Sequence, residues 1–479
     1  MSFQILIYSI ISLGLKIADE RVWPIKGFYM EKSSALNANL VDINKQEKQK
    51  LLNKLLWKIM PILFLAYMFS FLDRVNIGYA KLQMQDYIGF TDIQYAYAAG
   101  IFFIGYALFE IPSNLLMDKI GARKTLTRIM VLWGVASAAT VFITTVNQLY
   151  MIRFLLGIFE AGFYPGVFLY FSYWFPSYMR GRVAAIILAG SLVAPIIGGP
   201  ISGIIMTEMD GFGGWFGWQW MFLLEALPII FIGIFCLFYL SDKPSTSKWL
   251  TDHEKVMHQK IMNDDVGNKA THHDKSAHSM SNILSCMSDA RIYLLAFLAF
   301  ATYCGNYGFS FWLPTMIKDM GVTNIAHISF YAVIPFSLGA VGLFLITRSS
   351  DKRRERRWHY ALSMIFASSM LVLAAYWEGG IISRLIILGF ASFGFMGGMA
   401  LAWTLPTGYL DGKTAPVGIA LVSTLATTAG YFAPWIMGVM REHFGTNQAA
   451  LVSIAAVMLL ASILMMFVVP AKAVYVSKK

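Results

Sequence analysis

Long apolar segments follow one another along this 479-residue chain, and they constrain its fold more than any other feature. Each can cross about 30 Å of hydrocarbon as an α-helix, which takes about 20 residues. None keeps the period-2 alternation of a membrane β-strand. Helices satisfy their own backbone hydrogen bonds in lipid, so we expect an all-α polytopic membrane protein. The predicted spans are residues 57–79, 92–115, 125–144, 149–173, 183–207, 218–240, 290–316, 326–347, 358–376, 382–405, 416–440 and 448–469.

Composition supports a lipid bilayer as the surroundings of the chain. Hydrophobic residues make up 57% and charged residues 14%, against about 45–50% and about 25% in soluble domains. The net charge of +11 could indicate nucleic acid, but the basic residues lie in short loops between apolar segments. We therefore expect no nucleic-acid partner.

The sequence offers little for catalysis or for a bound cofactor. Cys236, Cys286 and Cys304 lack metal-ligand spacing and imply no disulfide framework. The stretch Gly408–Thr414 resembles a phosphate loop, but it has three residues between its glycines where four are needed. We find no nucleophile motif either, and we predict no metal, no cofactor and no enzymatic activity.

The basic residues also predict the topology. They concentrate in the loops that follow the even-numbered spans, whereas the odd loops are short and poor in basic residues. Positive charge marks the cytoplasmic side of a membrane. We therefore place the even loops and both termini in the cytoplasm, as expected for a multi-pass protein of the cell inner membrane. The even-loop residues are Lys119, Arg123, Lys124, Arg180, Arg182, Arg348, Lys352, Arg353, Arg354, Arg356 and Arg357.

The polar stretches divide the chain into two sets of six spans. Residues 241–288 form a predicted cytoplasmic linker between bundles at 57–240 and 289–470, with a cytoplasmic tail at 471–479. Histidines in the linker could bind a metal, but a solvated linker is the better interpretation; they are His253, His258, His272, His273 and His278.

The N-terminal tail, residues 1–56, has an unusual beginning. Its apolar part is too short to span a membrane and lacks the features of a signal peptide. Met30 opens an ordinary lysine-rich tail. Our hypothesis is that Met30 is the true start and that residues 1–29 are an upstream extension.

The two halves share weak internal repeats. The loops Asp118–Lys124 and Asp351–Arg357 each begin with an acid and continue with basic residues. The fourth and tenth spans share their glycine spacing, with Glu160 matched by Ser392. Such repeats are typical of transporters built from duplicated halves.

Several motifs resemble those of the major facilitator superfamily, and of its anion:cation symporter family in particular. The loop Asp118–Lys124 is similar to the superfamily's loop signature, although Asn114 stands where a glycine is usual. The resemblance covers about residues 50–470 and implies twelve transmembrane helices in two pseudo-symmetric six-helix bundles. It is closest to permeases for hydroxyphenylacetate, tartrate, phthalate and sugar acids. The motifs of the symporter family are Phe71–Gly78, Glu160–Gly166, Trp218–Glu225 and Trp249–Lys255.

Four charged residues lie within predicted spans: Asp73, Arg74, Arg153 and Glu160. A charge in hydrocarbon costs about 2.5–3.5 kcal/mol on insertion scales, so it usually has a partner and a function. With about 1.5 Å of rise per residue, Asp73, Arg74 and Arg153 lie toward the outer side and Glu160 near the midplane, so all four could line one outward-leaning cavity. The alternative is a set of structural ion pairs without a transport role.

These residue types suit proton-coupled anion transport, as the resemblance also implies. Proton coupling needs carboxylates whose protonation responds to their surroundings, and Asp73 and Glu160 are the candidates. A substrate carboxylate needs a planar, permanently charged fork, for which Arg74 is the first choice. Arg153 is a second candidate contact, and we expect it to hold Glu160 or Asp73 in the empty state. Glu225 in the sixth span could be structural or functional.

Other residues complete the predicted site. Aromatic and amide side chains could hold the rest of the substrate; the candidates are Asn76, Tyr303, Asn306, Tyr307, Trp312 and Trp403. The resemblance implies that the repeated loop motif latches the two halves on the cytoplasmic side. Its residues are Asp118, Lys119, Gly121, Arg123, Lys124 and Asp351.

We therefore predict a secondary transporter that imports an organic carboxylate together with protons and functions as a monomer. An exchanger of organic anions on the same fold is the alternative. A non-transporting scaffold would have no need of buried titratable groups.

Overall fold

The computed structural model describes residues 45–267, 287–406, 410 and 415–470. All regular secondary structure in these residues is helical, and 12 candidate spans are long and apolar enough to cross a membrane. The predicted fold class is confirmed. The spans agree closely with those expected, apart from the first. It runs over Lys45–Gly89 instead of 57–79, and the expected tail boundary at residue 56 therefore falls inside a helix.

Several spans consist of consecutive helices. The first half contains α3 (Lys45–Val75), α4 (Ile77–Met84), α5 (Asp92–Ile120), α6 (Ala122–Ala139), α7 (Val146–Glu160), α8 (Phe163–Trp174), α9 (Ser177–Val193), α10 (Gly199–Glu208) and α11 (Gly217–Tyr239). The second half contains α14 (Ala290–Asp319), α15 (Ile325–Arg353), α16 (Arg357–Tyr376), α17 (Ile381–Ala402), α19 (Ala415–Thr427), α20 (Ala429–Phe444) and α21 (Asn447–Phe467).

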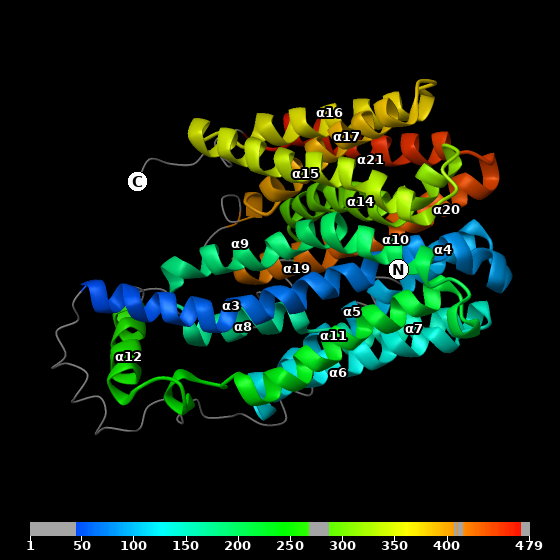
Figure 1. Cartoon of the computed structure of the whole chain (residues 1–479). Coiled ribbons are helices and arrows are strands. Elements are labelled where there is room, and N and C mark those ends of the chain that lie inside the picture. The colour runs from blue at the N-terminus through cyan, green and yellow to red at the C-terminus, as the bar shows by residue number, and fades with distance from the viewer. Residues whose placement is uncertain (1–44, 268–286, 407–409, 411–414, 471–479) are drawn as a thin grey trace.

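The helices form two bundles that lie side by side (Figure 1). In the first, α6 packs on α11 and α5 on α7; in the second, α15 packs on α17 and α16 on α21. Contacts between the bundles join α5 to α20, α10 to α15 and α4 to α14. The expected pair of six-helix bundles is therefore present.

Close backbone approach holds the two bundles together at one end. A Cβ atom on Gly438 in α20 would lie 2.5 Å from the Cβ of Ala96 and 2.9 Å from the carbonyl oxygen of Asp92, both in α5. Only glycine allows this separation. The contact lies near the loop between the first and second spans, so the bundles meet at the end of the odd loops.

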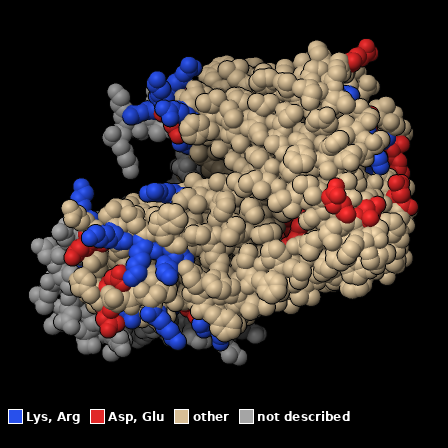
Figure 2. Space-filling model, viewed as in Figure 1, with Lys and Arg blue, Asp and Glu red and all other residues tan. Residues whose placement is uncertain are grey.

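The other end carries most of the basic residues. Figure 2 shows lysine and arginine gathered at the end where the molecule is hollowed between its halves, and acidic residues at the far end. We call these the basic end and the closed end. The structure therefore opens between the bundles on the side of the even loops.

The linker contains a docked helix, α12 (Asp252–Gly267), so the prediction of a solvated linker is wrong here. Lys54 Nζ lies 2.8 Å from both carboxylate oxygens of Glu254. The Asp265 carboxylate accepts from the backbone N–H and hydroxyl of Ser177, at the first turn of α9. Among the described residues, no cluster of histidine, cysteine and acidic side chains could hold a metal. His272, His273 and His278 lie outside the described residues.

His258 should make the docking of α12 sensitive to pH. Its Nε2 lies 2.9 Å from the Trp174 carbonyl oxygen, and the ring is buried. Burial lowers the pKa of His258, although the hydrogen bond to Trp174 acts in the opposite direction. The undocked helix therefore binds more protons, and docking weakens as the pH falls through about 6.5 and below.

Hydrogen exchange of residues 252–265, corrected for intrinsic rates, measures this effect. His258→Gln keeps a donor for Trp174 and cannot titrate, so it should remove the pH dependence. His253→Gln, at an exposed position of the same helix, should leave it unchanged. Equal pH dependence in wild type and His258→Gln would contradict the assignment.

Candidate functional site

Breaks in two helices place the central charged residues. Helix α3 ends at Val75, directly after Arg74, and α7 ends at Glu160. Gly162 follows with φ of +85°, a left-handed conformation that starts α8 in a new direction. Irregular backbone inside a membrane is tolerated where it lines a cavity. The two breaks therefore mark where the first and fourth spans contribute to a site.

Arg74 and Glu160 form a buried ion pair. Arg74 donates to Glu160 Oε1 from Nε at 2.8 Å and from Nη2 at 2.5 Å. The Ser70 hydroxyl donates to the same oxygen. Glu160 Oε2 has no hydrogen-bond partner among the described residues. The Glu160 side chain is fully buried, whereas 11% of the Arg74 side chain is exposed. The arginine is therefore the member of the pair that solvent reaches.

Aromatic rings surround this pair from both halves. The Arg74 guanidinium lies 5.1 Å from the ring centroid of Tyr106 and 5.5 Å from that of Phe102. Tyr307 approaches Arg74 from α14 in the second half. Its ring lies 4.7 Å from that of Phe103. The site therefore sits at the boundary between the bundles.

Arg153 lies beside this site but is not part of the ion pair. It is fully buried, its Nε donates to the Ala98 carbonyl at 3.4 Å, and its guanidinium lies 5.2 Å from the Phe102 ring centroid. Its two terminal nitrogens have no hydrogen-bond partner among the described residues. The prediction that Arg153 holds Glu160 is wrong in this conformation, because Arg74 holds Glu160. Toward Asp73, Arg153 acts through its charge, with no hydrogen bond between them among the described residues.

A second polar cluster contains the other two buried carboxylates. Asp73 accepts from Trp133 Nε1 at 3.2 Å and from the Ser137 hydroxyl. Glu225 accepts from the Ser202 hydroxyl at 2.5 Å and from Asn76 Nδ2 at 3.1 Å.

The cluster shows that Asn76 contacts Glu225 and not Arg74. From the sequence alone, the role of Glu225 could be either structural or functional. The sequence feature that drew attention to Glu225 was the position of an acidic residue inside an apolar span.

The candidates of the second half divide between two places. Trp403 Nε1 donates to the Tyr303 hydroxyl at 3.1 Å, and the rings of Tyr303 and Tyr307 lie 5.7 Å apart. Asn306 is buried, and its Oδ1 has no partner in the described part of the chain. Trp312 lies elsewhere, at the closed end.

An ionic cluster joins the two halves at the closed end. Asp92 accepts from Lys81 Nζ at 2.6 Å and from Arg441 Nε at 3.0 Å. Arg441 also reaches Asp319 at 2.7 Å. The ring centroid of Trp312 lies 4.1 Å from Lys81 Nζ and 5.3 Å from the Arg441 guanidinium. We call these five residues the closed-end latch.

Sequence reasoning missed this latch. The odd loops were expected to be poor in basic residues, but the side chain of Lys81 is only 1% exposed. The sequence feature that could have indicated the latch was a lysine, Lys81, within an extended apolar segment.

Removing Arg441 should open the closed end. Arg441→Ala deletes the ion pair to Asp92, which crosses between the halves, together with the pair to Asp319 inside the second half. Coupling of this kind is typically worth about 1–3 kcal/mol, or about 5–150-fold in population. Spin labels at Tyr87 and Phe444, exposed positions on opposite halves, should report a longer distance in this variant. An unchanged distance distribution would mean that the latch does not hold the conformation.

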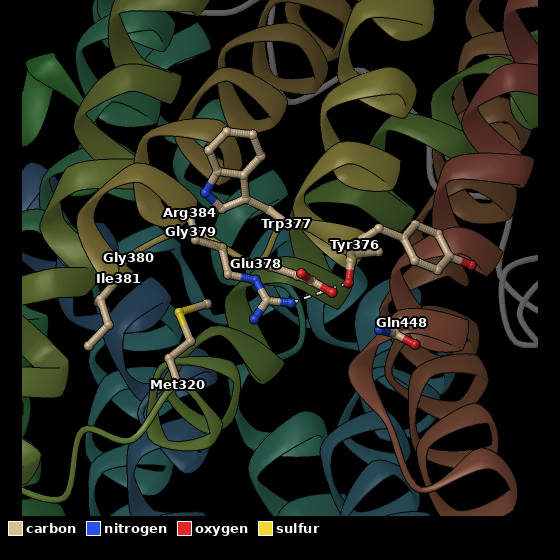
Figure 3. A pocket seen from close by; sticks show the side chains of 10 residues that line it. Met320, Tyr376, Trp377, Glu378, Gly379, Gly380, Ile381, Arg384 and Gln448 are labelled. Carbon is tan, nitrogen blue, oxygen red and sulfur yellow. Dashed lines mark hydrogen bonds between the residues drawn. The ribbon is translucent and has the colours of Figure 1, made fainter.

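Arg384 provides the matched control at the same end. Its Nε donates to the Ala374 carbonyl at 2.8 Å and its Nη2 to that of Ala375 at 3.3 Å. This arginine lines a pocket of about 620 Å³, and Figure 3 shows it beside Glu378. These contacts stay within the second half, so Arg384→Ala should leave the label distance unchanged.

The repeated loop motif lies at the basic end. Gly121 has φ of +89°, and a Cβ there would lie 2.6 Å from Asp242 Oδ1. The same oxygen accepts from the Arg123 backbone N–H at 2.9 Å. Lys119, Lys124 and Asp351 are exposed, and the side chain of Asp118 lies outside the described residues.

Comparison with known proteins places these observations in a family. Residues 63–423 match the family described as Major Facilitator Superfamily. A metabolite transport protein named NicT, from Pseudomonas putida, is 36% identical over 88% of this chain and 95% of its own length. A protein of Agrobacterium vitis named as a tartrate transporter is 37% identical, with the same coverage of each chain. The resemblance predicted from the motifs is confirmed.

Two further matches, one by sequence and one by structure, are informative. A quinolone resistance transporter of Acinetobacter baumannii is 35% identical over 85% of this chain and 92% of its own length. The crystal structure of a D-xylose-proton symporter matches with a TM-score of 0.67 at 16% identity, over 87% of this chain and 98% of that one. At this identity the structural match supports the fold alone.

Proposed function

The chain belongs to the Major Facilitator Superfamily, and we propose that it imports an organic carboxylate by proton symport. The substrate classes are hydroxy-aromatic acids, hydroxy diacids and sugar acids. The relative named as a tartrate transporter supports the second class. The protein acts as a secondary transporter and not as an enzyme.

The ion pair between Arg74 and Glu160 carries this proposal. Arg74 presents a planar fork suited to a carboxylate, and 11% of its side chain is exposed. The fork is occupied by Glu160 in this structure. A substrate carboxylate and the Glu160 carboxylate therefore compete for one guanidinium, and a proton on Glu160 decides the competition.

This competition couples the movement of the proton to the movement of the substrate anion. When Glu160 takes up a proton, it loses its charge and releases Arg74, which then binds the substrate carboxylate. When the proton leaves, Glu160 displaces the anion from Arg74. The Ser70 hydroxyl holds Glu160 Oε1 in position. The exchangeable proton and the anion thus enter and leave together.

The remaining candidates line the same boundary in this proposal. Tyr307, Tyr303 and Trp403 face the site from the second half, and Asn306 offers an amide oxygen without a partner in the described residues. Arg153 adds positive charge beside Arg74 without touching the substrate in this conformation.

The open end faces the cytoplasm in our proposal, because the basic loops lie there. Both termini are then cytoplasmic, and the protein is a multi-pass monomer of the cell inner membrane. Opening alternates between the two ends as the bundles rock around the central site. The closed-end latch breaks in the outward-facing state, and the loop motif around Gly121 then joins the halves on the cytoplasmic side.

Exchange of organic anions is the second candidate. One relative is named for quinolone resistance and not for uptake of a metabolite. If a substrate anion could displace Glu160 from Arg74 while Glu160 stays unprotonated, the protein would exchange anions without moving protons.

Transport by the purified protein in proteoliposomes distinguishes the two modes. The labelled panel is 4-hydroxyphenylacetate, tartrate, galactonate and phthalate, with an imposed inward proton gradient. Symport predicts gradient-driven uptake of at least one member. Uptake only into vesicles preloaded with an anion would favour the exchanger, and no transport of any member would contradict a carboxylate substrate.

A further inference from the structure

Asp73 and Glu225 line one small void inside the first half. Its walls come from α3, α6 and α11, and it has no room for a water molecule. Both acids are buried, with exposed fractions of 6% and 7%. A carboxylate in a dry apolar cavity is stable only when it is paired or protonated.

The direct partners of both carboxylates are neutral. Asp73 accepts from an indole N–H and a serine hydroxyl, and Glu225 from a serine hydroxyl and an amide. The charged groups that interact electrostatically with Asp73 are Glu160 and Arg153, neither in hydrogen-bond contact with it among the described residues. The titratable groups that interact with Glu225 are Asp73 and Tyr79. No cation touches either acid in the described part of the chain.

The balance of charge among the five groups of this region also favours a bound proton. The buried central groups comprise the arginines Arg74 and Arg153 and the acids Asp73, Glu160 and Glu225. With every group ionised, the acids outnumber the arginines by one. Glu160 is neutralised by direct contact with Arg74. One proton on either of the other two acids makes the region neutral.

We propose that Glu225 and Asp73 form a proton-binding pair, separate from the arginine that binds the anion. The void leaves no space for a sodium ion with any water in this conformation, so the bound cation is a proton. The proton comes from water and returns to water once a movement of the helices wets the void. The inference rests on the proposed proton symport and adds Glu225 to its proton-carrying groups.

Glu225→Gln tests the pair directly. Asn76 Oδ1 has no partner among the described residues, so a flip of the Asn76 amide can accept the new N–H and keep the fold. We expect substrate exchange within about twofold of wild type, because exchange needs no net proton movement, and at least about tenfold less gradient-driven accumulation. Glu208→Gln, at an exposed acid outside the cluster, should behave like wild type.

Infrared spectroscopy of the substrate-free full-length protein supplies a readout that is independent of transport. At neutral pH we expect a protonated-carboxyl band that is lost or shifted in Glu225→Gln and in Asp73→Asn. If wild type transports with protons while Glu225→Gln keeps both the accumulation and the band, the pair is overturned and symport stands. If wild type shows no proton-driven uptake, the proposed symport fails, and the infrared band alone then decides whether the pair binds a proton. A band that neither Glu225→Gln nor Asp73→Asn changes overturns the proton-binding pair.

Discussion

Replacing Arg74 by alanine is expected to abolish carboxylate uptake and to weaken substrate binding at least about 100-fold. Truncating one member of a buried hydrogen-bonded charge pair typically costs about 2–5 kcal/mol. Arg74→Lys keeps the charge but loses the planar fork that reaches Glu160 through Nε and Nη2, so it should retain only weak binding. Uptake of the labelled panel and stabilisation against heat by the substrate measure both effects.

A control is needed because Arg74→Ala leaves Glu160 buried without its counter-charge. The double variant Arg74→Ala with Glu160→Gln removes both charges, and it should recover stability without recovering binding. Substrate binding by the double variant at wild-type affinity would show that Arg74 is a structural partner of Glu160 and not the anion site.

Neutralising Glu160 should separate anion transport from proton transport. Glu160→Gln leaves Arg74 free for the substrate whether or not a proton is present. We expect exchange to persist, gradient-driven accumulation to fall at least about tenfold, and the pH dependence of substrate affinity to disappear. Uptake under an imposed gradient and equilibrium binding between about pH 5 and 8 measure these changes.

Ser70→Ala should change the pH dependence of substrate affinity less than Glu160→Gln does. It removes one hydrogen bond to Glu160 Oε1, typically worth about 1.5–3 kcal/mol when the acceptor is charged, and it should shift the pH dependence without removing it. Glu225→Gln should leave the pH dependence of binding intact, because Glu225 does not contact Arg74. Uphill accumulation by Glu160→Gln at the wild-type level would refute the proposed competition.

The sequence predicted the twelve spans because apolar length is a local property. The first span was misjudged since its helix continues through polar residues from Lys45, where lysine and glutamine favour a helix without apolar patterning. The helix α12 was missed for a similar reason. Its docking depends on contacts with distant residues such as Lys54 and Trp174.

The central charges could be recognised from the sequence, but their pairing could not. Arg153 and Glu160 share a face of α7, yet seven residues of rise separate them by about 10 Å along the axis. Arg74 reaches Glu160 instead, because α3 and α8 bring the first and fourth spans together. The latch between Asp92 and Arg441 joins residues 349 positions apart, and no local pattern predicts such a contact.

Direct measurement of proton movement tests the central claim. Substrate is added to proteoliposomes in a lightly buffered medium, without an imposed gradient, and the external pH is followed with a glass electrode. Proton symport predicts that the medium becomes more alkaline as the labelled carboxylate enters, and that Glu160→Gln shows no such change. Carboxylate uptake without any change of pH, and only into vesicles loaded with a second anion, would contradict the account.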